Sequence, residues 1–414
     1  MFFIYKLAIR FYLFSIRIAS FFNPKAKRWI EGRKNWEKGL KQKINRNDRY
    51  IWVHCASLGE FEQGRPLIEK LKSEYPSRKI LLSFFSPSGY EIRKNYEHAD
   101  AVVYLPMDTG RNARKFLEIL NPELAVFVKY EFWFNYIAEL KRRNIPVFVV
   151  SAIFREKQHF FRSWGKWFRK QLHKINWIFV QNEDSLKLLE GVGITHCSLS
   201  GDTRFDRVAQ IAETSKAFPE VENFVGGQKV LLAGSTWPPG EKLIQTFLHE
   251  RYNDLKLIIA PHEVHQERIN GIENSFPDKC IRYSNIHQST GSENILIIDS
   301  IGKLSHLYQY ASLAYIGGGF GVGIHNILEA ATFGKPVIFG PNYQKFKEAR
   351  DLISLGGAFS VSNADAFKSI MRKLLAEQGE YEKASRVCKQ YTRENQGATN
   401  IIFQKMKDLL SLQE

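Results

Sequence analysis

The stretch AYIGGGFGVGIHNILEAATFGKPVIFGP (Ala314–Pro341) combines a strand, a glycine loop, a helix pattern and a second strand. Ala314–Ile316 is a short apolar run, and five glycines fall within the seven residues that follow it. Glycine lets a backbone approach a ligand closely, and a helix N-terminus favours phosphate. The stretch therefore predicts a nucleotide or phosphate site in the second half of the chain, with His325 and Asn326 at the helix N-terminus.

Short apolar runs alternate with helix patterns on both sides of this stretch. We expect strands at 50–54, 80–85, 101–105, 124–128, 147–150, 177–180, 197–199, 230–233, 255–260, 295–298, 314–316 and 337–339. Helix patterns cover 66–74, 109–120 and 132–143. Such alternation is typical of parallel sheets covered on both faces. The fold class predicted is α/β with two doubly wound, Rossmann-like domains, whose strand carboxyl ends would meet at a shared cleft.

The length of 414 residues also favours two domains. Residues 24–49 are polar and basic and suggest a connector, and residues 207–228 lose the strand–helix rhythm. The expected organisation is a helix at 1–23, a first domain at 24–206, a linker at 207–228, a second domain at 229–375 and a charged helical tail at 376–414.

The formal net charge of +16 is high. Nucleic acid, an anionic membrane and an acidic small substrate would each explain it, and a merely soluble basic surface is the alternative. No nucleic acid is expected as a partner, because the cations are dispersed and no known nucleic-acid module occurs. The four cysteines are scattered without a C-x-x-C pair, which indicates neither a zinc ribbon nor a disulfide framework and favours a reducing compartment.

The N-terminal residues 1–22, MFFIYKLAIRFYLFSIRIASFF, are rich in Phe, Ile and Leu. Lys6, Arg10 and Arg17 interrupt this run at spacings that place them on one helical face. The pattern predicts an amphipathic helix in the interface of an anionic membrane, rather than a signal peptide or a spanning helix. A helix packed on the protein itself is the alternative.

Three polar motifs follow expected strands in the first half: SLGE, KYEFW and GDTRFD. Glu60 ends the first motif and is either a general base or an acid favoured at a helix start. Glu131 lies in the second motif, where a surface ion pair beside a buried Trp is the alternative. Arg204 could grip a phosphate or carboxylate, or else bridge to an Asp of its own motif.

Two further motifs, AGST and PHEVH, follow strands in the second half. The small residues of AGST offer backbone amides to an anion. PHEVH contains H-E-x-H rather than H-E-x-x-H, so its two histidines would not share a helix face as zinc ligands. Polar contact between His262 and a nucleotide is the better interpretation. No G-x-x-x-x-G-K-[ST] loop occurs, and the glycine cluster is not the G-x-G-x-x-G of a dehydrogenase.

Taken in order, SLGE, KYEFW, GDTRFD, AGST and G-x-H-N-x-L-E-A-A resemble the 3-deoxy-D-manno-octulosonic acid (Kdo) transferases of lipopolysaccharide synthesis. These glycosyltransferases have the two-domain GT-B fold, and the resemblance covers nearly the whole chain. It implies transfer of Kdo from CMP-Kdo to the lipid A precursor (lipid IVA), with inversion, at the cytoplasmic face of the inner membrane. The first domain would then bind the acceptor, and the second would bind CMP-Kdo.

The resemblance also implies roles for residues. Glu60 would deprotonate the acceptor hydroxyl, and Glu131 and Arg204 would support the transition state. The residues implied in CMP binding are His262, Glu263, Ile301, Gly302, Lys303, Asn326, Ile327, Leu328 and Glu329. Two positions depart from the family pattern: Arg204 stands where many relatives have Lys, and PHE replaces the usual PRH at Pro261–Glu263.

No cofactor or metal is expected, because CMP is already a good leaving group and one base, one cation and a helix N-terminus suffice. The D-x-D motif of metal-dependent glycosyltransferases is also missing from the sequence. Two alternatives remain: a GT-B enzyme that uses a UDP-sugar, such as a lipid-linked N-acetylglucosamine transferase or an epimerase, and a non-catalytic protein that binds lipid A.

Overall fold

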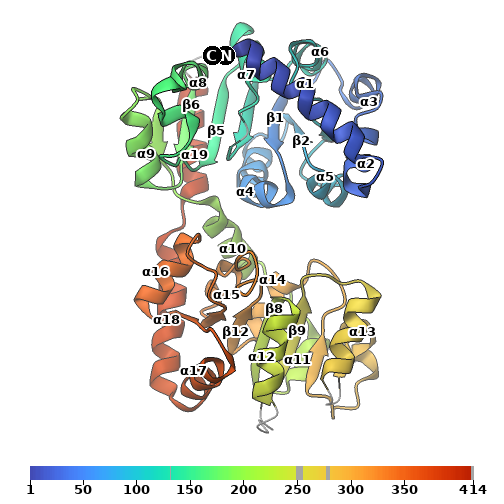
Figure 1. Cartoon of the computed structure of the whole chain (residues 1–414), viewed down its shortest axis with the longest axis vertical. Coiled ribbons are helices and arrows are strands. Elements are labelled where there is room, and N and C mark those ends of the chain that lie inside the picture. Colours follow the sequence, from blue (N-terminus) through green and yellow to red (C-terminus); the bar gives the residue numbers. More distant parts are fainter. Residues whose placement is uncertain (131, 249–254, 277–279, 412–414) are drawn as a thin grey trace. The chain divides into compact units, whose positions relative to one another are not determined.

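The computed structural model describes residues 1–130, 132–248, 255–276 and 280–411. The chain divides into two compact units (Figure 1). Unit 1 comprises Met1–Arg207 together with Gln396–Glu414, and unit 2 comprises Val208–Asn395. Each unit has its own sheet and its own buried core.

Unit 1 contains a parallel sheet of seven strands within the described residues, in the order β3-β2-β1-β4-β5-β6-β7. The strands are β1 (Tyr50–Cys55), β2 (Lys79–Phe84), β3 (Ala101–Tyr104), β4 (Leu124–Val128), β5 (Val147–Ala152), β6 (Trp177–Val180) and β7 (Cys197–Leu199). Every residue of β1, β4 and β5 is buried, because helices cover both faces of the sheet.

The helices of unit 1 are α1 (Phe2–Ala19), α2 (Pro24–Glu31), α3 (Trp36–Lys43), α4 (Leu58–Glu74), α5 (Pro87–Arg93), α6 (Gly110–Leu120), α7 (Phe134–Arg142), α8 (Lys166–Leu172), α9 (Glu183–Glu190), the start of α10 (Thr203–Glu213) and α19 (Ala398–Ser411). Two short 3₁₀ turns, η1 (His159–Phe161) and η2 (Ser163–Gly165), precede α8.

Unit 2 repeats the architecture, with a parallel sheet in the order β10-β11-β9-β8-β12-β13-β14 among the described residues. Its strands are β8 (Lys229–Thr236), β9 (Leu255–Pro261), β10 (Cys280–Arg282), β11 (Ile295–Ile297), β12 (Leu313–Ile316), β13 (Val337–Phe339) and β14 (Ala358–Ser360). Its helices are α11 (Pro219–Val225), α12 (Pro238–Leu248), α13 (Gln266–Ser275), α14 (Leu304–Leu307), α15 (Leu328–Ala331), α16 (Lys347–Leu355), α17 (Ala364–Ala376) and α18 (Gln378–Glu394). The two parallel sheets confirm the predicted α/β class.

The helix α1 packs on unit 1 through only one of its faces. Tyr5, Ile9, Leu13 and Ile16 recur at helical spacing and join a small cluster with Trp29, Met107 and Trp133. The Tyr5 hydroxyl donates to the buried Asp108 carboxylate, which also accepts the amides of Asn135 and Tyr136 at the start of α7. Within the described part of the chain, none of the helices has the length and hydropathy needed to span a bilayer.

The opposite face of α1 is apolar and uncovered. Its exposed residues, with 48% to 77% of their surface accessible, are Phe3, Leu7, Phe11, Phe14 and Ile18. Lys6, Arg10 and Arg17 are also exposed, and at 100° per residue they lie on the flank between the packed face and the apolar face. The alternative considered from the sequence was a helix packed on the protein itself. This packing is present, but it covers only one side of α1.

The predicted connector at 24–49 is wrong, because it folds as α2 and α3. Asn23 caps α2 by accepting the amides of Lys25 and Ala26, and Pro24 supplies a favoured first residue. Arg33 then anchors the segment: its guanidinium lies over the Trp29 ring and donates to the carbonyls of Leu105 and Phe85. Burial lowers the Arg33 pKa to about 9, so the group stays charged near neutral pH.

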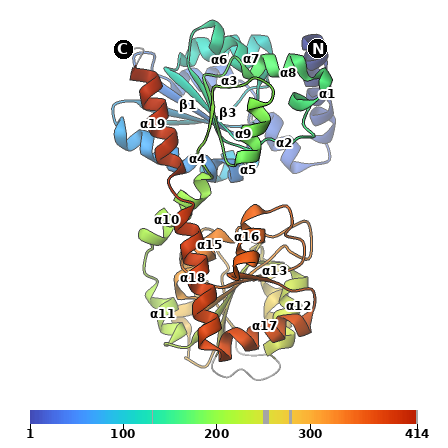
Figure 2. The ribbon, with the colours of Figure 1, turned by 90° about the vertical axis from the view of Figure 1, so that its left-hand side faces the viewer.

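The ranges predicted as a linker and a tail are organised differently. Residues 207–228 contain most of α10 and all of α11, and the boundary between the units falls inside α10. Residues 376–414 are not one tail, since the chain returns to unit 1 at Gln396. The Asp206 carboxylate fixes this return by accepting the amides of Gly397 and Thr399, and Figure 2 shows α19 beside the sheet of unit 1.

Candidate functional site

The sheet of unit 1 changes direction between β1 and β4, where successive strands are added on opposite sides. Loops diverge at such a point and leave a crevice outside the carboxyl ends of the strands. Glu60 follows β1 and lies in the first turn of α4, where its Oε2 accepts the Ala56 amide at 2.5 Å. Gly59, directly before Glu60, is exposed, and a Cβ placed there would meet no atom within 4 Å.

Lys129 is the residue of this site that sequence reasoning missed. It follows β4 with φ at 71°, in the left-handed region that non-glycine residues rarely adopt. Burial lowers the pKa of its ammonium group, Arg204 lowers it further, and the charges of Glu60 and Asp202 oppose the shift. The Lys129 ammonium therefore interacts electrostatically with residues of both motifs, SLGE and GDTRFD. The charged start of KYEFW was the available signal in the sequence.

Arg204 lies in the first turn of α10, and its guanidinium pairs with Asp202, with Nη2 to Oδ2 at 2.7 Å. The sequence analysis left open an ion pair between Arg204 and an Asp of GDTRFD, and this ion pair is present. The neighbouring Thr203 hydroxyl donates to the Gln63 carbonyl at 2.6 Å and contacts the Ser151 hydroxyl at 2.9 Å. These bonds tie the start of α10 to α4 and β5, so the Arg204 side chain projects from a fixed position.

Glu131, the third predicted residue of this unit, lies outside the described residues. The Trp133 that follows it is well fixed. Its indole N–H donates to Nε2 of the buried His54 at 3.0 Å, and the other ring nitrogen of His54 contacts Ser83. The His54 proton is therefore on Nδ1, and the motif KYEFW is anchored to β1 and β2 at its tryptophan.

The sheet of unit 2 changes direction between β8 and β12, and the glycine loop follows β12. A Cβ on Gly317 would lie 2.0 Å from the Ser235 carbonyl oxygen, and one on Gly319 would lie 2.6 Å from the Gly340 nitrogen. These two glycines are needed for close packing against the ends of β8 and β13. The expected helix after the loop is only α15, a single turn of four residues, and is too short for a helix-dipole phosphate site.

Three stacked rings lie beside the glycine loop. His262, after β9, stacks against both Trp237 and His325 with centroid distances of 4.9 and 4.4 Å. The Trp237 N–H donates to His325 Nε2 at 3.2 Å, so these two rings lie side by side. Burial and the neighbouring His262 both lower the His325 pKa, which keeps this ring neutral near pH 7. The rings line an apolar hollow of about 360 Å³. The Tyr315 hydroxyl, also lining it, is buried without a hydrogen-bond partner among the described residues.

The other predicted donor residues follow the same strand ends. Glu263 pairs with His265 at 3.5 Å. Ile301 is 78% exposed, in a turn where Gly302 has φ of 91° and the Lys303 ammonium donates to Ser300 at 2.8 Å.

Around α15 the predicted residues divide into two kinds. Asn326 donates to the Glu329 carboxylate at 3.1 Å and caps the α15 turn by accepting the Leu328 amide. Ile327 and Leu328 are buried in the core, so they could offer a ligand only their backbone.

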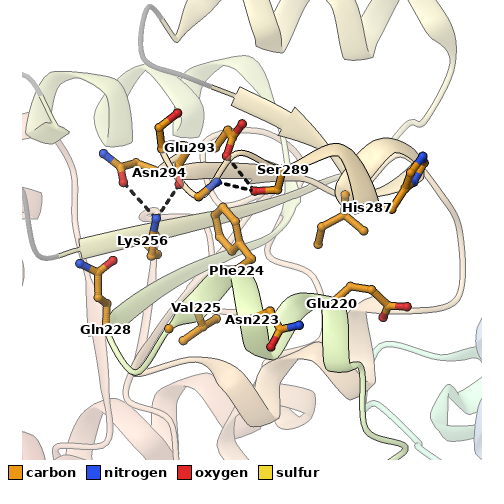
Figure 3. A pocket seen from close by; sticks show the side chains of 14 residues that line it. Glu220, Asn223, Phe224, Val225, Gln228, Lys256, His287, Ser289, Glu293 and Asn294 are labelled. Carbon is orange, nitrogen blue, oxygen red and sulfur yellow. Dashed lines mark hydrogen bonds between the residues drawn. The ribbon is translucent and has the colours of Figure 1, made fainter.

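A larger hollow of about 730 Å³ lies at the amino ends of β8, β9 and β11 (Figure 3). The Lys256 ammonium there donates to the Glu293 carbonyl at 2.5 Å and to Asn294 Oδ1 at 3.2 Å, and it lies over the Phe224 ring. Its hydrogen bonds are made within the protein, and ligands of open parallel sheets bind at the opposite edge. This hollow is therefore not a candidate for the donor site.

Comparison with known proteins finds sequences and structures to which this chain is similar. Residues 30–207 match the family model described as 3-deoxy-D-manno-octulosonic-acid transferase (kdotransferase). A 3-deoxy-D-manno-octulosonic acid transferase of Haemophilus influenzae is 28% identical over 376 residues, which cover 87% of this chain and 86% of that protein. The chain is thus similar to Kdo transferases over most of its length, and the match to the family model falls within unit 1.

Two other relatives extend the comparison. A bifunctional glycosyltransferase/methyltransferase of Fusobacterium nucleatum is 28% identical over 82% of this chain, which spans only 54% of that longer protein. The structure of UDP-GlcNAc 2-epimerase from Neisseria meningitidis, bound to UDP-GlcNAc, has a TM-score of 0.61 at 16% identity and covers 87% of this chain and all of its own. The similarity to the epimerase structure concerns the fold alone, and this fold is consistent with the GT-B-like architecture expected from the sequence.

The packing of Gly317 predicts a stability effect. Gly317→Ala should lower the free energy of unfolding by about 2 kcal/mol, because its Cβ would press on the Ser235 backbone. Gly321→Ala is the matched control in the same loop, since its nearest atom would be 3.6 Å away. Thermal unfolding of the full chain measures both, and equal melting temperatures for the two variants would contradict the packing role.

Proposed function

We propose that this protein transfers Kdo from CMP-Kdo to a sugar hydroxyl of the lipid A precursor, with inversion and without a metal. The observation that carries the proposal is the position of the Glu60 carboxylate, which lies at the switch point of the family-matched unit and interacts electrostatically with Lys129. A carboxylate in this position suits a general base.

The proposed reaction is a single displacement. Glu60 accepts the proton of the acceptor hydroxyl, while the oxygen of that hydroxyl attacks the anomeric carbon of Kdo. The bond from that carbon to the CMP phosphate breaks, and CMP leaves with the electron pair. Lys129 and Arg204 supply positive charge for the carboxylate and phosphates of the substrates, and Glu131 would stabilise the positive charge that develops on the sugar.

The donor is proposed to bind at the carboxyl edge of the unit 2 sheet. The Trp237–His262–His325 stack gives a flat apolar surface for a base or sugar. Glu263, the turn of Ile301, Gly302 and Lys303, and the backbone of Asn326 to Glu329 surround the same strand ends. His262 stands where the family pattern has Arg, and its ring would contribute stacking.

The helix α1 is proposed to lie on the cytoplasmic face of the inner membrane. Its uncovered apolar face and flanking cations match an interfacial helix on an anionic bilayer. Its packed face contacts Met107 and Trp133, which follow β3 and β4. A lipid acceptor held at this surface is therefore presented at the same sheet edge as Glu60.

Glu60→Gln is expected to lower transfer by about 100-fold or more, because the amide cannot accept the hydroxyl proton. Its remaining oxygen can still accept the Ala56 amide, so the start of α4 should persist. Mass spectrometry of the product formed from CMP-Kdo and a lipid A precursor measures turnover. Glu74→Gln, at the exposed end of the same helix, is the control, and wild-type turnover by Glu60→Gln would refute the assignment of the base.

The nucleotide preference separates the proposal from a UDP-sugar enzyme, because the fold itself is shared with UDP-GlcNAc 2-epimerases. CMP at about 100 times its dissociation constant should stabilise the protein by about 2.7 kcal/mol, seen as a higher melting temperature. Cytidine, which lacks the phosphate, is the control and should give a smaller shift. Protection by UDP but not by CMP would favour the UDP-sugar alternative.

The role of α1 is tested in the full chain. Phe3→Ser combined with Phe11→Ser should release the protein from vesicles that contain phosphatidylglycerol, since both side chains are exposed and would lose their place in the bilayer. Leu355→Ser changes an exposed apolar residue of unit 2 and should have no effect. Cosedimentation measures both, and undiminished binding of the double variant would exclude α1 as the anchor.

A further inference from the structure

The chain between β5 and β6 has an unusual surface. Residues 155–170, here called the 155–170 segment, include η1, η2 and the start of α8. Trp164 in this segment is 59% exposed and is the only exposed tryptophan among the described residues. Seven Lys or Arg residues and one acid, Glu156, occur between positions 155 and 174. The Trp164 ring, which is surrounded by cations, is not part of the buried core of unit 1.

The cations of the segment are uncompensated. The exposed members are Arg155, Lys157, Arg162, Lys166 and Lys170. In the described parts of the chain, none of the five forms an ion pair with a carboxylate, whereas many other cations of unit 1 do. A surface of this kind is complementary to a partner that carries negative charge over an extended area.

The segment is held in a defined shape. Arg169 donates from Nη1 to the carbonyls of Phe160 and Arg162 at 2.8 and 3.0 Å. Gly165 lets the chain turn tightly, since a Cβ there would lie 2.0 Å from the His159 carbonyl oxygen. Phe160 is buried beneath the turn. Trp164 therefore projects from a fixed turn, and its exposure is a feature of the packed structure.

The segment is continuous with α1. The Trp167 ring packs against Phe2 and Tyr5 of α1, at centroid distances of 6.3 and 6.1 Å. Phe168 then links Trp167 to Trp164, at 4.9 and 6.0 Å. Both ribbon views show α8 beside the N-terminal end of α1 (Figures 1 and 2). Trp164 is thus joined through ring contacts to the N-terminal end of α1.

We propose that the 155–170 segment is a second membrane-contact element, in which Trp164 enters the interface of an anionic bilayer and the exposed cations meet the lipid headgroups. Tryptophan is enriched at this level of a membrane because its ring is apolar and its N–H is polar. Each nearby Lys or Arg adds attraction to anionic lipid. The inference rests on the proposed membrane association of α1.

The second contact has a consequence for orientation. A single interfacial helix leaves the attached unit free to roll about the helix axis, whereas two elements that diverge from Trp167 define a plane. The segment also begins at the candidate site, since the Arg155 guanidinium lies over the Tyr130 ring, directly after Lys129. The two contacts together would hold the carboxyl edge of the unit 1 sheet against the lipid surface.

The experiment uses the full chain and vesicles of phosphatidylcholine with or without phosphatidylglycerol. Lys166→Gln combined with Lys170→Gln should weaken binding to the anionic vesicles by about tenfold or more, and Trp164→Ala should weaken it several-fold. Lys383→Gln with Lys389→Gln removes two exposed cations from α18 in unit 2 and is the matched control, which should bind as the wild type does. Circular dichroism verifies that all variants are folded.

Fluorescence gives an independent reading of Trp164. Brominated lipids should quench part of the tryptophan emission of the wild type, and this part should be missing from Trp164→Phe. One outcome would overturn the second contact and leave the role of α1 standing. In this outcome, the Trp164 and lysine variants bind vesicles as the wild type does, while the variant with Phe3→Ser and Phe11→Ser is released. A wild-type protein that binds no vesicles would overturn both, and equal quenching in Trp164→Phe would overturn the insertion of Trp164.

Discussion

Parallel pairing at two switch points is the constraint on which the rest of the structure depends. β1 pairs with β4 and β8 pairs with β12, each in parallel, although many residues separate the partners in sequence. Each pairing brings together two loops that leave the sheet at the same edge and diverge. In unit 1 these loops carry Glu60 and Lys129, whose charges interact, and in unit 2 they carry Trp237 and the glycine loop. The candidate chemistry therefore follows from strand order.

Local backbone strain is concentrated at these strand ends. Lys129, Ser151 and Ser235 all have positive φ, and the pairing of β5 with β6 and of β8 with β9 shifts register near the two serines. Surrounding packing must maintain such conformations, which cost free energy in isolation. The Ser151–Thr203 contact and the close approach of Gly317 to Ser235 are two of the interactions that do so.

The surface of unit 1 connects the chemistry to a lipid substrate. Asp108 links α1 to the start of α7, while Trp167 links α1 to the segment after β5. Elements that leave the sheet at its carboxyl edge therefore support the helix with the exposed apolar face. In the proposed function, the membrane-bound acceptor and the base lie at the same edge, so that binding to the membrane would also orient the acceptor.

The sequence by itself determined the strand–helix alternation, the two parallel sheets, the amphipathic α1 and the family motifs, because apolar periodicity and residue identity are local properties. It did not reveal that 24–49 is helical, that α19 returns to unit 1, or that the charge of Lys129 interacts with that of Glu60. It also overestimated the helix after the glycine loop, where Gly317 and Gly319 serve backbone packing. Only the tertiary structure decided these points, because burial, left-handed backbone and contacts between distant residues depend on which strands become neighbours.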